Sequence, residues 1–186
     1  MNNRLGKMSL GKVGKWLVDE AGKVGIDIRG FEHEITNEFV NHVVKKHGNE
    51  KAEAFRGQIA VKQDDFDKIS EVINSPDLVM VGVKTLGRDM VAYAKKMPDG
   101  TTLYIEEVLS GKRNKTLRGK TMFKHKNMPD EKVFYRIISN GNGVDMTNTK
   151  ILAMGRRGQS GDPTIEESVA VADTASAHKP GETAGR

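Results

Sequence analysis

"LVMVGVKTLGRDMVAYAKKMPDGTTLYIEEVL", residues 78–109, contains three apolar runs in succession, and these runs set the architecture of the chain. The runs at 78–84, 89–96 and 101–109 are rich in the β-branched and aromatic side chains that strands favour. "MPDG" separates the last two runs and has the composition of a tight turn. Short strands joined by links of hairpin length predict an antiparallel sheet.

The segment that follows predicts a fourth strand, over residues 116–126, and carries an unusual charge. "GKRNKTLRGKTMFKHK", residues 111–126, holds seven Lys or Arg and no acidic residue. Because side chains alternate along a regular strand, two sets are expected on opposite faces. One set is Leu117, Gly119, Thr121, Phe123 and His125, and the other is Arg118, Lys120, Met122, Lys124 and Lys126. The cations fit either a solvated face or a surface that binds phosphate.

Two helices are predicted before the sheet. "ITNEFVNHVVKKHG" has an apolar face at helical spacing and predicts a helix over 36–47, with Thr36 as N-cap and Gly48 at the stop. "VKQDDFDKISEVINSP", residues 61–76, predicts the second. Helices followed by strands indicate an α+β fold in which N-terminal helices pack on a four-stranded antiparallel sheet.

The ends of the chain are less regular. Residues 1–24 predict a basic amphipathic helix, weakened by glycines, whose Trp16 is expected to pack on the domain rather than on a membrane. We expect one domain over 1–130. Residues 131–154 form an extension whose first part, 131–139, reads as either strand or helix. Residues 155–186 lack periodicity and are expected to be a disordered tail.

Composition excludes several classes of protein. The chain has 186 residues, a net charge of +5 and no cysteine, so disulfides, thiolate catalysis and cysteine-type zinc sites are excluded. A basic body favours anionic partners such as nucleic acid. No apolar run approaches the roughly 20 residues of a membrane span. We therefore expect a cytoplasmic protein without stable membrane insertion.

The candidate chemistry begins with two histidines on the first predicted helix. His42 and His47 lie five positions apart, about 140° around a helix, unlike a metal-binding pair at i and i+4. No metal site is therefore expected. His47 lies where the helix dipole favours an imidazolium, which suits a general acid, although spacing alone also fits a structural role. Arg56 and Gln58 lie in a polar link, where an Arg could bind phosphate.

Four segments taken in order carry a resemblance to a known family. "HVVKKHG", "RGQIAVKQDDFDKISEVINSPDLV", "YAKKMPDGTTLYIEEV" and "KTMFKHK" resemble the phage-associated nuclease domains of the barnase–EndoU–colicin–RelE superfamily, over about residues 15–127. These domains are toxin modules of phage head proteins and mobile-element polyproteins. The resemblance implies RNA cleavage without a metal or other cofactor. It implies as catalytic residues His42, His47, Thr121 and Lys124, and as phosphate-binding residues Arg56 and Gln58. The charge of the last predicted strand adds Arg118 and Lys120 as phosphate-binding residues at its rim.

The implied reaction is transesterification by the 2′-OH of RNA, with histidines as general base and acid and cations on the phosphorane. The implied partners are RNA, with tRNA among the candidates, and an acidic immunity protein. Delivery into a target cell within a larger effector or phage particle would accompany this role. The alternatives are a non-catalytic basic domain that binds nucleic acid or protein, and a membrane-associated module that uses the basic N-terminal segment.

Overall fold

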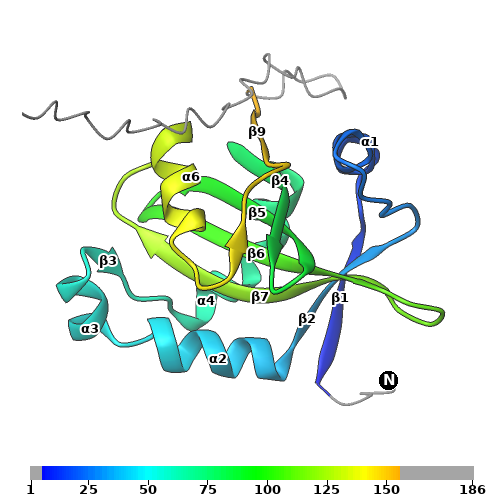
Figure 1. Ribbon diagram of the computed structural model, residues 1–186. Coiled ribbons are helices and arrows are strands. Elements are labelled where there is room, and N and C mark those ends of the chain that lie inside the picture. Colours follow the sequence, from blue (N-terminus) through cyan, green and yellow to red (C-terminus); the bar gives the residue numbers. More distant parts are fainter. Residues whose placement is uncertain (1–5, 156–186) are drawn as a thin grey trace, which may run out of the picture.

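The computed structural model of the chain describes residues 6–155, and Figure 1 shows the arrangement of its elements. The strands are β1 Lys7–Lys12, β2 Glu32–Thr36, β3 Gln58–Ile59, β4 Leu78–Thr85, β5 Arg88–Met97, β6 Gly100–Ser110, β7 Lys115–His125, β8 Val144–Asp145 and β9 Lys150–Ala153. The helices are α1 Lys15–Lys23, α2 Asn37–His47, α3 Glu50–Phe55, α4 Gln63–Asp67, α5 Ile69–Asn74 and α6 Glu131–Ser139. The expected disordered tail falls on 156–186, outside the described residues.

The described strands form one mixed sheet of nine strands, which corrects the prediction of a four-stranded antiparallel sheet. The four predicted strands are present as β4 to β7, and each pairs antiparallel with the next. Beyond β7 the sheet continues through β2 and β1, and β2 runs parallel to β7. On the other side β4 pairs with β8 and β9. These additional strands are short and pair with distant segments, so local sequence patterns do not reveal them.

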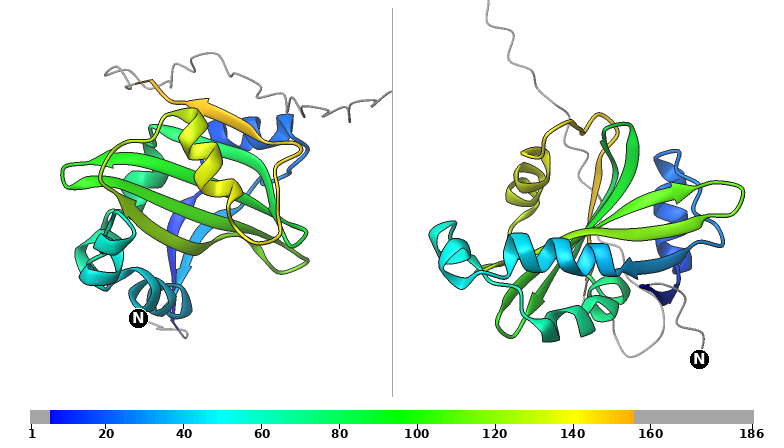
Figure 2. Two further views of the ribbon diagram at one scale, coloured as in Figure 1. Left: turned by 60° about the vertical axis from the view of Figure 1, so that its left-hand side comes forward. Right: turned by 90° about the horizontal axis from the view of Figure 1, so that it is seen from below.

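The sheet is covered on both faces, and each cover has its own core. Figure 2 (right) shows α4 and α5 on one side of the strands and α6 on the other. The larger core includes side chains of α1, α2 and α5, among them Leu17, Phe39 and Val72. The smaller core packs Phe134 and Ile138 of α6 against the opposite face of β4 to β6. Burial of apolar area in these two layers is the main stabilising contribution.

The helix expected over 36–47 is confirmed by α2. Its N-cap Thr36 accepts a hydrogen bond from the Phe39 amide at 3.2 Å, and Gly48 follows its last turn. The second predicted helix is present in two pieces, because α4 ends before Lys68 and α5 begins after it.

The N-terminal segment differs from its prediction. Residues 7–12 form the edge strand β1, and helix α1 begins only at Lys15. Gly6 and Gly11 adopt positive φ angles of 62° and 104°, which disfavour a helix, and pairing with β2 satisfies the backbone instead. Trp16 packs against the larger core, in agreement with the expectation.

The segment after residue 130 belongs to the same sheet. Residues 131–139, which read as either strand or helix, form α6, and its N-cap Asp130 accepts from the Val133 amide at 2.8 Å. The following β8 and β9 pair with β4. Lys150 at the start of β9 also donates to Glu20 of α1 at 2.9 Å. Between residues 6 and 155, no helix is long and apolar enough to cross a membrane.

A bulge in β7 reverses the expected alternation of its side chains. Ile105 pairs with Thr121 whereas Glu106 pairs with Gly119, so Lys120 is an extra residue on β7. Leu117 before the bulge and Met122 after it therefore both lie in the larger core. The prediction that Leu117 and Gly119 share a face with Thr121, Phe123 and His125 is thus wrong, because the bulge moves these three to the α6 side.

Gly119 makes the bulge compatible with the core beneath it. A Cβ atom at this position would lie 2.8 Å from the Tyr104 hydroxyl oxygen and 3.2 Å from the Phe39 ring. Any other residue would displace these two buried rings, so glycine allows the strand to approach them.

Candidate functional site

Helix α2 lies along the edge of β7, as Figure 1 shows. Strand β2 pairs with β7 at Thr116–Arg118 and β3 pairs with it at Lys124–His125. The middle of β7, which contains the bulge, lies between these two pairings and faces α2. The amide of Val61 donates to the carbonyl of His47 at 2.7 Å and thereby ties the end of α2 to the segment after β3.

A buried carboxylate orients the histidine at the end of α2. His47 Nδ1 lies 3.2 Å from Glu53 Oε2, and the Glu53 side chain is fully buried. Arg56 donates from Nη1 to the other oxygen of Glu53 and to the Lys46 carbonyl at 3.2 Å. A buried charge needs partners. Glu53 therefore holds the side chains of both His47 and Arg56 in place. With Nδ1 engaged, Nε2 is the nitrogen of His47 left for a ligand.

Two imidazoles lie close to one aromatic ring on the α6 side of β7. The ring centroid of Phe123 lies 5.5 Å from that of His47 and 5.7 Å from that of His125. Phe123 and His125 alternate with buried residues of β7, and both are partly exposed. The end of α2 and the end of β7 therefore bring two histidines, 78 positions apart in sequence, beside the same Phe123 ring.

His125 is held in a neutral state by its surroundings. Burial lowers the pKa of its imidazole below the usual 6.5, and the nearby Glu53 carboxylate offsets only part of this shift. Its Nε2 is buried, and no hydrogen-bond partner for it exists within residues 6–155. Gln58 Oε1 is also buried and has no hydrogen-bond partner within residues 6–155. Gln58 is the residue of β3 that pairs with His125 of β7. Buried polar atoms without partners are uncommon in folded proteins, so these two on adjacent strands mark a position where a further polar group could bind.

The remaining basic groups extend the site along α2. The pKa of His42 is lowered by partial burial and by the positive charges of His47, Lys46 and Lys120. Lys120 is exposed on the bulge and Thr121 next to it is half-buried. Several residues that the sequence singled out thus lie along α2, β3 and the middle of β7: His42, His47, Arg56, Gln58, Lys120 and Thr121. In the part of the chain that the structure describes, no three His, Asp or Glu side chains are grouped as metal ligands would be.

Lys124 and Arg118 are not available in this region. Lys124 points to the opposite face of the sheet, is 1% exposed, and forms ion pairs with Asp65 at 3.0 Å and with Asp99. Arg118 is bound through Nε and Nη2 to one carboxylate oxygen of Glu34, at 2.8 Å in each case. Both cations are neutralised by acids from other elements, and we assign them structural roles.

His125 and Glu53 are missing from the site that the sequence predicts. Strand alternation placed His125 with Thr121, and the bulge preserves this relation because both residues follow it. Nothing in the local sequence marks Glu53, since it meets His47 only because α3 folds back on α2. Helix α3 makes up most of the segment between α2 and the polar link predicted at Arg56 and Gln58.

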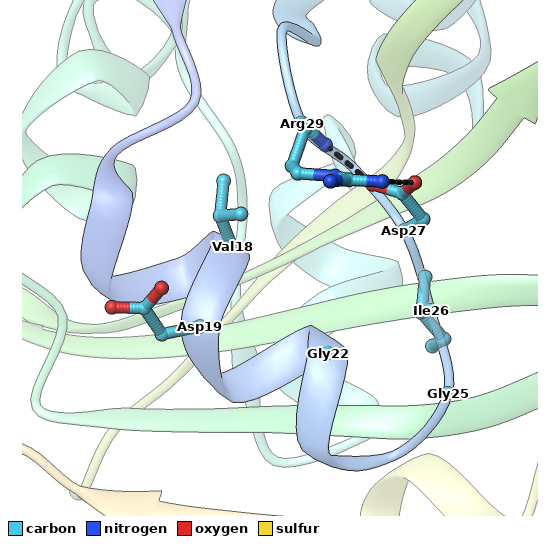
Figure 3. Close-up of a pocket in the computed structure, with 7 residues that line it drawn as sticks. All are labelled: Val18, Asp19, Gly22, Gly25, Ile26, Asp27 and Arg29. Carbon is cyan, nitrogen blue, oxygen red and sulfur yellow. Dashed lines mark hydrogen bonds and ion pairs between the residues drawn. The ribbon is translucent and has the colours of Figure 1, made fainter.

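A second depression lies on the α1 side of the molecule and shares no residue with the histidine site. Figure 3 shows Asp19 of α1 and the turn that carries Asp27 and Arg29 around it. Arg29 binds Asp27 in a two-pronged arrangement at 2.9 and 2.6 Å, so its charge is already satisfied. This depression therefore offers a weaker basis for function than the histidine site.

Comparison with known proteins identifies a family for most of the chain. Searches of curated proteins and of solved structures find no match. A family model described as phage-Barnase-EndoU-ColicinE5/D-RelE like nuclease3 matches residues 11–132, more than half of the chain and the whole of the histidine site. The match ends at the start of α6. The chain therefore belongs to the phage-Barnase-EndoU-ColicinE5/D-RelE like nuclease3 family.

Proposed function

We propose that the protein is a metal-independent endoribonuclease that cleaves RNA by attack of the 2′-OH on the adjacent phosphate. The observation that carries this proposal is the pair of imidazoles, His47 and His125, whose ring centroids lie 5.5 and 5.7 Å from that of Phe123. This reaction needs one group to accept the 2′-OH proton and another to protonate the leaving 5′-oxygen. Two histidines with different surroundings meet this requirement.

We assign the base to His125. Because its pKa lies below the usual value, its imidazole is neutral and able to accept a proton at pH 7. Its ring is partly exposed, so a bound RNA can reach it and give up the 2′-OH proton there. The acid role falls to His47, whose Nδ1 is held by Glu53, so that Nε2 can donate to the leaving oxygen.

The cations of the same region would bind the phosphate. Lys120 is exposed beside the histidines, and Arg56 keeps about half of its side chain accessible although Glu53 holds it. The Thr121 hydroxyl can donate to an equatorial oxygen. Donors placed where charge develops stabilise the transition state more than the ground state, and they account for much of the rate in such reactions.

The direct test is incubation of the purified protein with total RNA in the presence of EDTA. We expect cleavage to continue, and the new ends should be 2′,3′-cyclic phosphates followed by 5′-hydroxyls. RNA that is bound but stays intact, with and without added divalent cations, would favour the alternative of a non-catalytic basic domain. Cleavage that stops with EDTA and returns with a divalent cation would contradict the metal-independent reaction.

Histidine variants separate the roles. His47→Gln and His125→Gln should each lower kcat by about 10²- to 10⁴-fold, the range for a lost general acid or base. His42→Gln is the matched control on the same helix, because His42 is exposed and is not one of the two imidazoles beside Phe123; we expect less than about a 10-fold loss. Circular dichroism should show that all three variants keep the fold. Equal loss in all three would contradict the assignment of the pair.

The biological setting proposed here follows the family resemblance. We propose that the protein acts as a toxin on cytoplasmic RNA, with tRNA among the candidate targets, and that an acidic protein inhibits it. The exposed cations around the site, Lys45, Lys46 and Lys120, would complement such an inhibitor. Expression of the active chain should arrest growth, whereas His125→Gln at the same level should not.

A further inference from the structure

A cavity of about 250 Å³ lies between the sheet and the segment that follows the family match. Its floor is the α6 face of β4 to β7, including Ala92 and Ile105. Its far wall is the end of α6 and the following loop, with Ile138 and Asn142. Thr121 and Lys120 complete it, so the cavity opens beside residues of the proposed catalytic site.

The lining has a definite chemical character. The walls are mostly aliphatic, and polar groups are confined to a few positions that include Thr85, Thr121 and the Asn142 amide. A nucleobase has the matching character, with apolar faces and hydrogen-bonding edges. Sites for drug-sized molecules begin at about 300 Å³, so this cavity suits one ring system rather than a whole nucleotide.

The position of Lys120 connects this cavity to the backbone of a substrate. Lys120 lines the cavity and is also close enough to His42 to lower the pKa of that histidine. One cation is thus shared between the aliphatic cavity and the surroundings of His42 on α2. A nucleotide whose phosphate lies at Lys120 can direct its base into the cavity, while the chain continues toward His47 and His125.

We infer that this cavity binds one unpaired nucleobase of the substrate next to the cleaved phosphate, and that the segment 138–144 sets base preference. The inference rests on the proposed ribonuclease function. The nuclease family match supplies the floor and the catalytic residues, whereas Ile138, Asn142 and Val144 lie beyond its end at residue 132. Base preference is therefore contributed by an element added to the nuclease domain.

The binding test does not depend on cleavage. Adenosine, guanosine, cytidine and uridine, which carry no phosphate, are titrated into the full chain while NMR signals of the Asn142 side-chain amide and of the Ile105 and Ile138 methyl groups are followed. We expect at least one nucleoside to shift these signals in a saturable manner. Shifts absent for all four nucleosides, or scattered over the surface, would overturn the inference.

The cleavage test uses short single-stranded RNAs with one abasic nucleotide at each position around the cut. Loss of the base that enters the cavity should lower kcat/KM by roughly 5- to 160-fold, the range expected from stacking of one base. Ala92→Leu, which fills the floor, should lower cleavage of the intact RNA and abolish the difference between intact and abasic RNA. Asn140→Ala is the control, because Asn140 is exposed in the same segment and does not line the cavity.

The two tests distinguish the inference from the function beneath it. Nucleoside binding in the cavity without any RNA cleavage would support the pocket and refute the ribonuclease. Cleavage that is indifferent to every abasic position, together with no nucleoside binding, would refute the pocket and leave the ribonuclease standing.

Discussion

Replacing Lys124 with Met separates a structural role for this lysine from a catalytic one. Burial alone would lower the pKa of the Lys124 amine, but hydrogen bonds to Asp99 and Asp65 outweigh burial and raise it, so the side chain is charged. Met keeps much of the apolar stem and removes the charge. Asp65, whose side chain is 4% exposed, is then left without its nearest cation.

The magnitude follows from what each aspartate retains. Removing one partner of a buried ion pair costs about 3–5 kcal/mol. Asp65 keeps the bond from the Lys62 amide at 2.8 Å and has Lys68 at 3.6 Å, and Asp99 is half-exposed and regains water. We therefore expect the lower end, about 3 kcal/mol of unfolding free energy, which for a chain of this size lowers Tm by roughly 6–12 °C.

The assay is urea unfolding followed by the fluorescence of the single tryptophan, Trp16, together with RNA cleavage at low temperature. Folded Lys124→Met should cleave within a few-fold of wild type. Asp99→Asn is the matched control, because it removes the exposed half of the same pair and should cost less than about 1 kcal/mol. Unchanged stability combined with a 100-fold or larger loss of cleavage would refute the structural role and make Lys124 a catalytic residue.

Three further predictions concern pH, salt and the core. Because the pKa of His125 is lowered, cleavage should rise with pH through an apparent pKa below 6.5. Glu53→Gln removes the charge that raises the pKa of His125. The NMR titration of the His125 ring in this variant should therefore move to still lower pH. Replacing the exposed cations at the tip of the β6–β7 hairpin with serine should leave kcat unchanged. It should flatten the dependence of log K for RNA on log salt by about 0.7 for each phosphate that these cations no longer neutralise. The cations replaced are Lys112, Arg113 and Lys115. Tyr93→Phe removes a 2.8 Å hydrogen bond to buried Glu106. It should lower the unfolding free energy measured in urea by about 1.5–3 kcal/mol. An unchanged unfolding free energy would show that buried Glu106 does not need the Tyr93 hydroxyl.

Local patterns predicted the elements whose signals lie within one segment. The cap at Thr36 and the stop at Gly48 fixed α2 within one residue, because capping depends on neighbouring backbone groups. The turn at residues 97–100 likewise fixed the β5–β6 hairpin. In contrast, β2 pairs with β7 across more than 80 residues, and no local periodicity encodes such a partner.

The bulge at Lys120 explains why the site could be predicted only in part. A regular strand places Thr121 and His125 with Leu117, and one inserted residue moves Leu117 to the opposite face. The insertion has no signal of its own in the sequence, because the close approach of Gly119 to the Tyr104 hydroxyl that accompanies it involves a residue of the neighbouring strand. Thr121 and His125 both follow the insertion in the chain. They therefore still share one face of the sheet, as alternation predicts.

Two buried glutamates show why residue type alone could not identify the functional histidine. Glu53 and Glu106 are both fully buried, and each has a histidine Nδ1 within 3.2 Å. The partner of Glu106, His33, is 3% exposed inside the larger core, and the hydroxyls of Tyr93 and Tyr104 also bind this carboxylate. Burial and the Glu106 charge raise the pKa of both tyrosines far above 10, so they serve as hydrogen-bond donors and not as acids.

The partner of Glu53 occupies a different position. His47 lies at the end of a helix beside the open part of β7, with its ring against Phe123 and part of its surface exposed. The same carboxylate–imidazole contact therefore stabilises the core at His33 and orients His47, the histidine for which we propose the acid role. The difference comes from the topology: β2 lies within the sheet, between β1 and β7, whereas α2 lies along the edge of β7. Access to the imidazole, rather than its spacing from other histidines, is therefore what separates His47 from His33 as a candidate for catalysis.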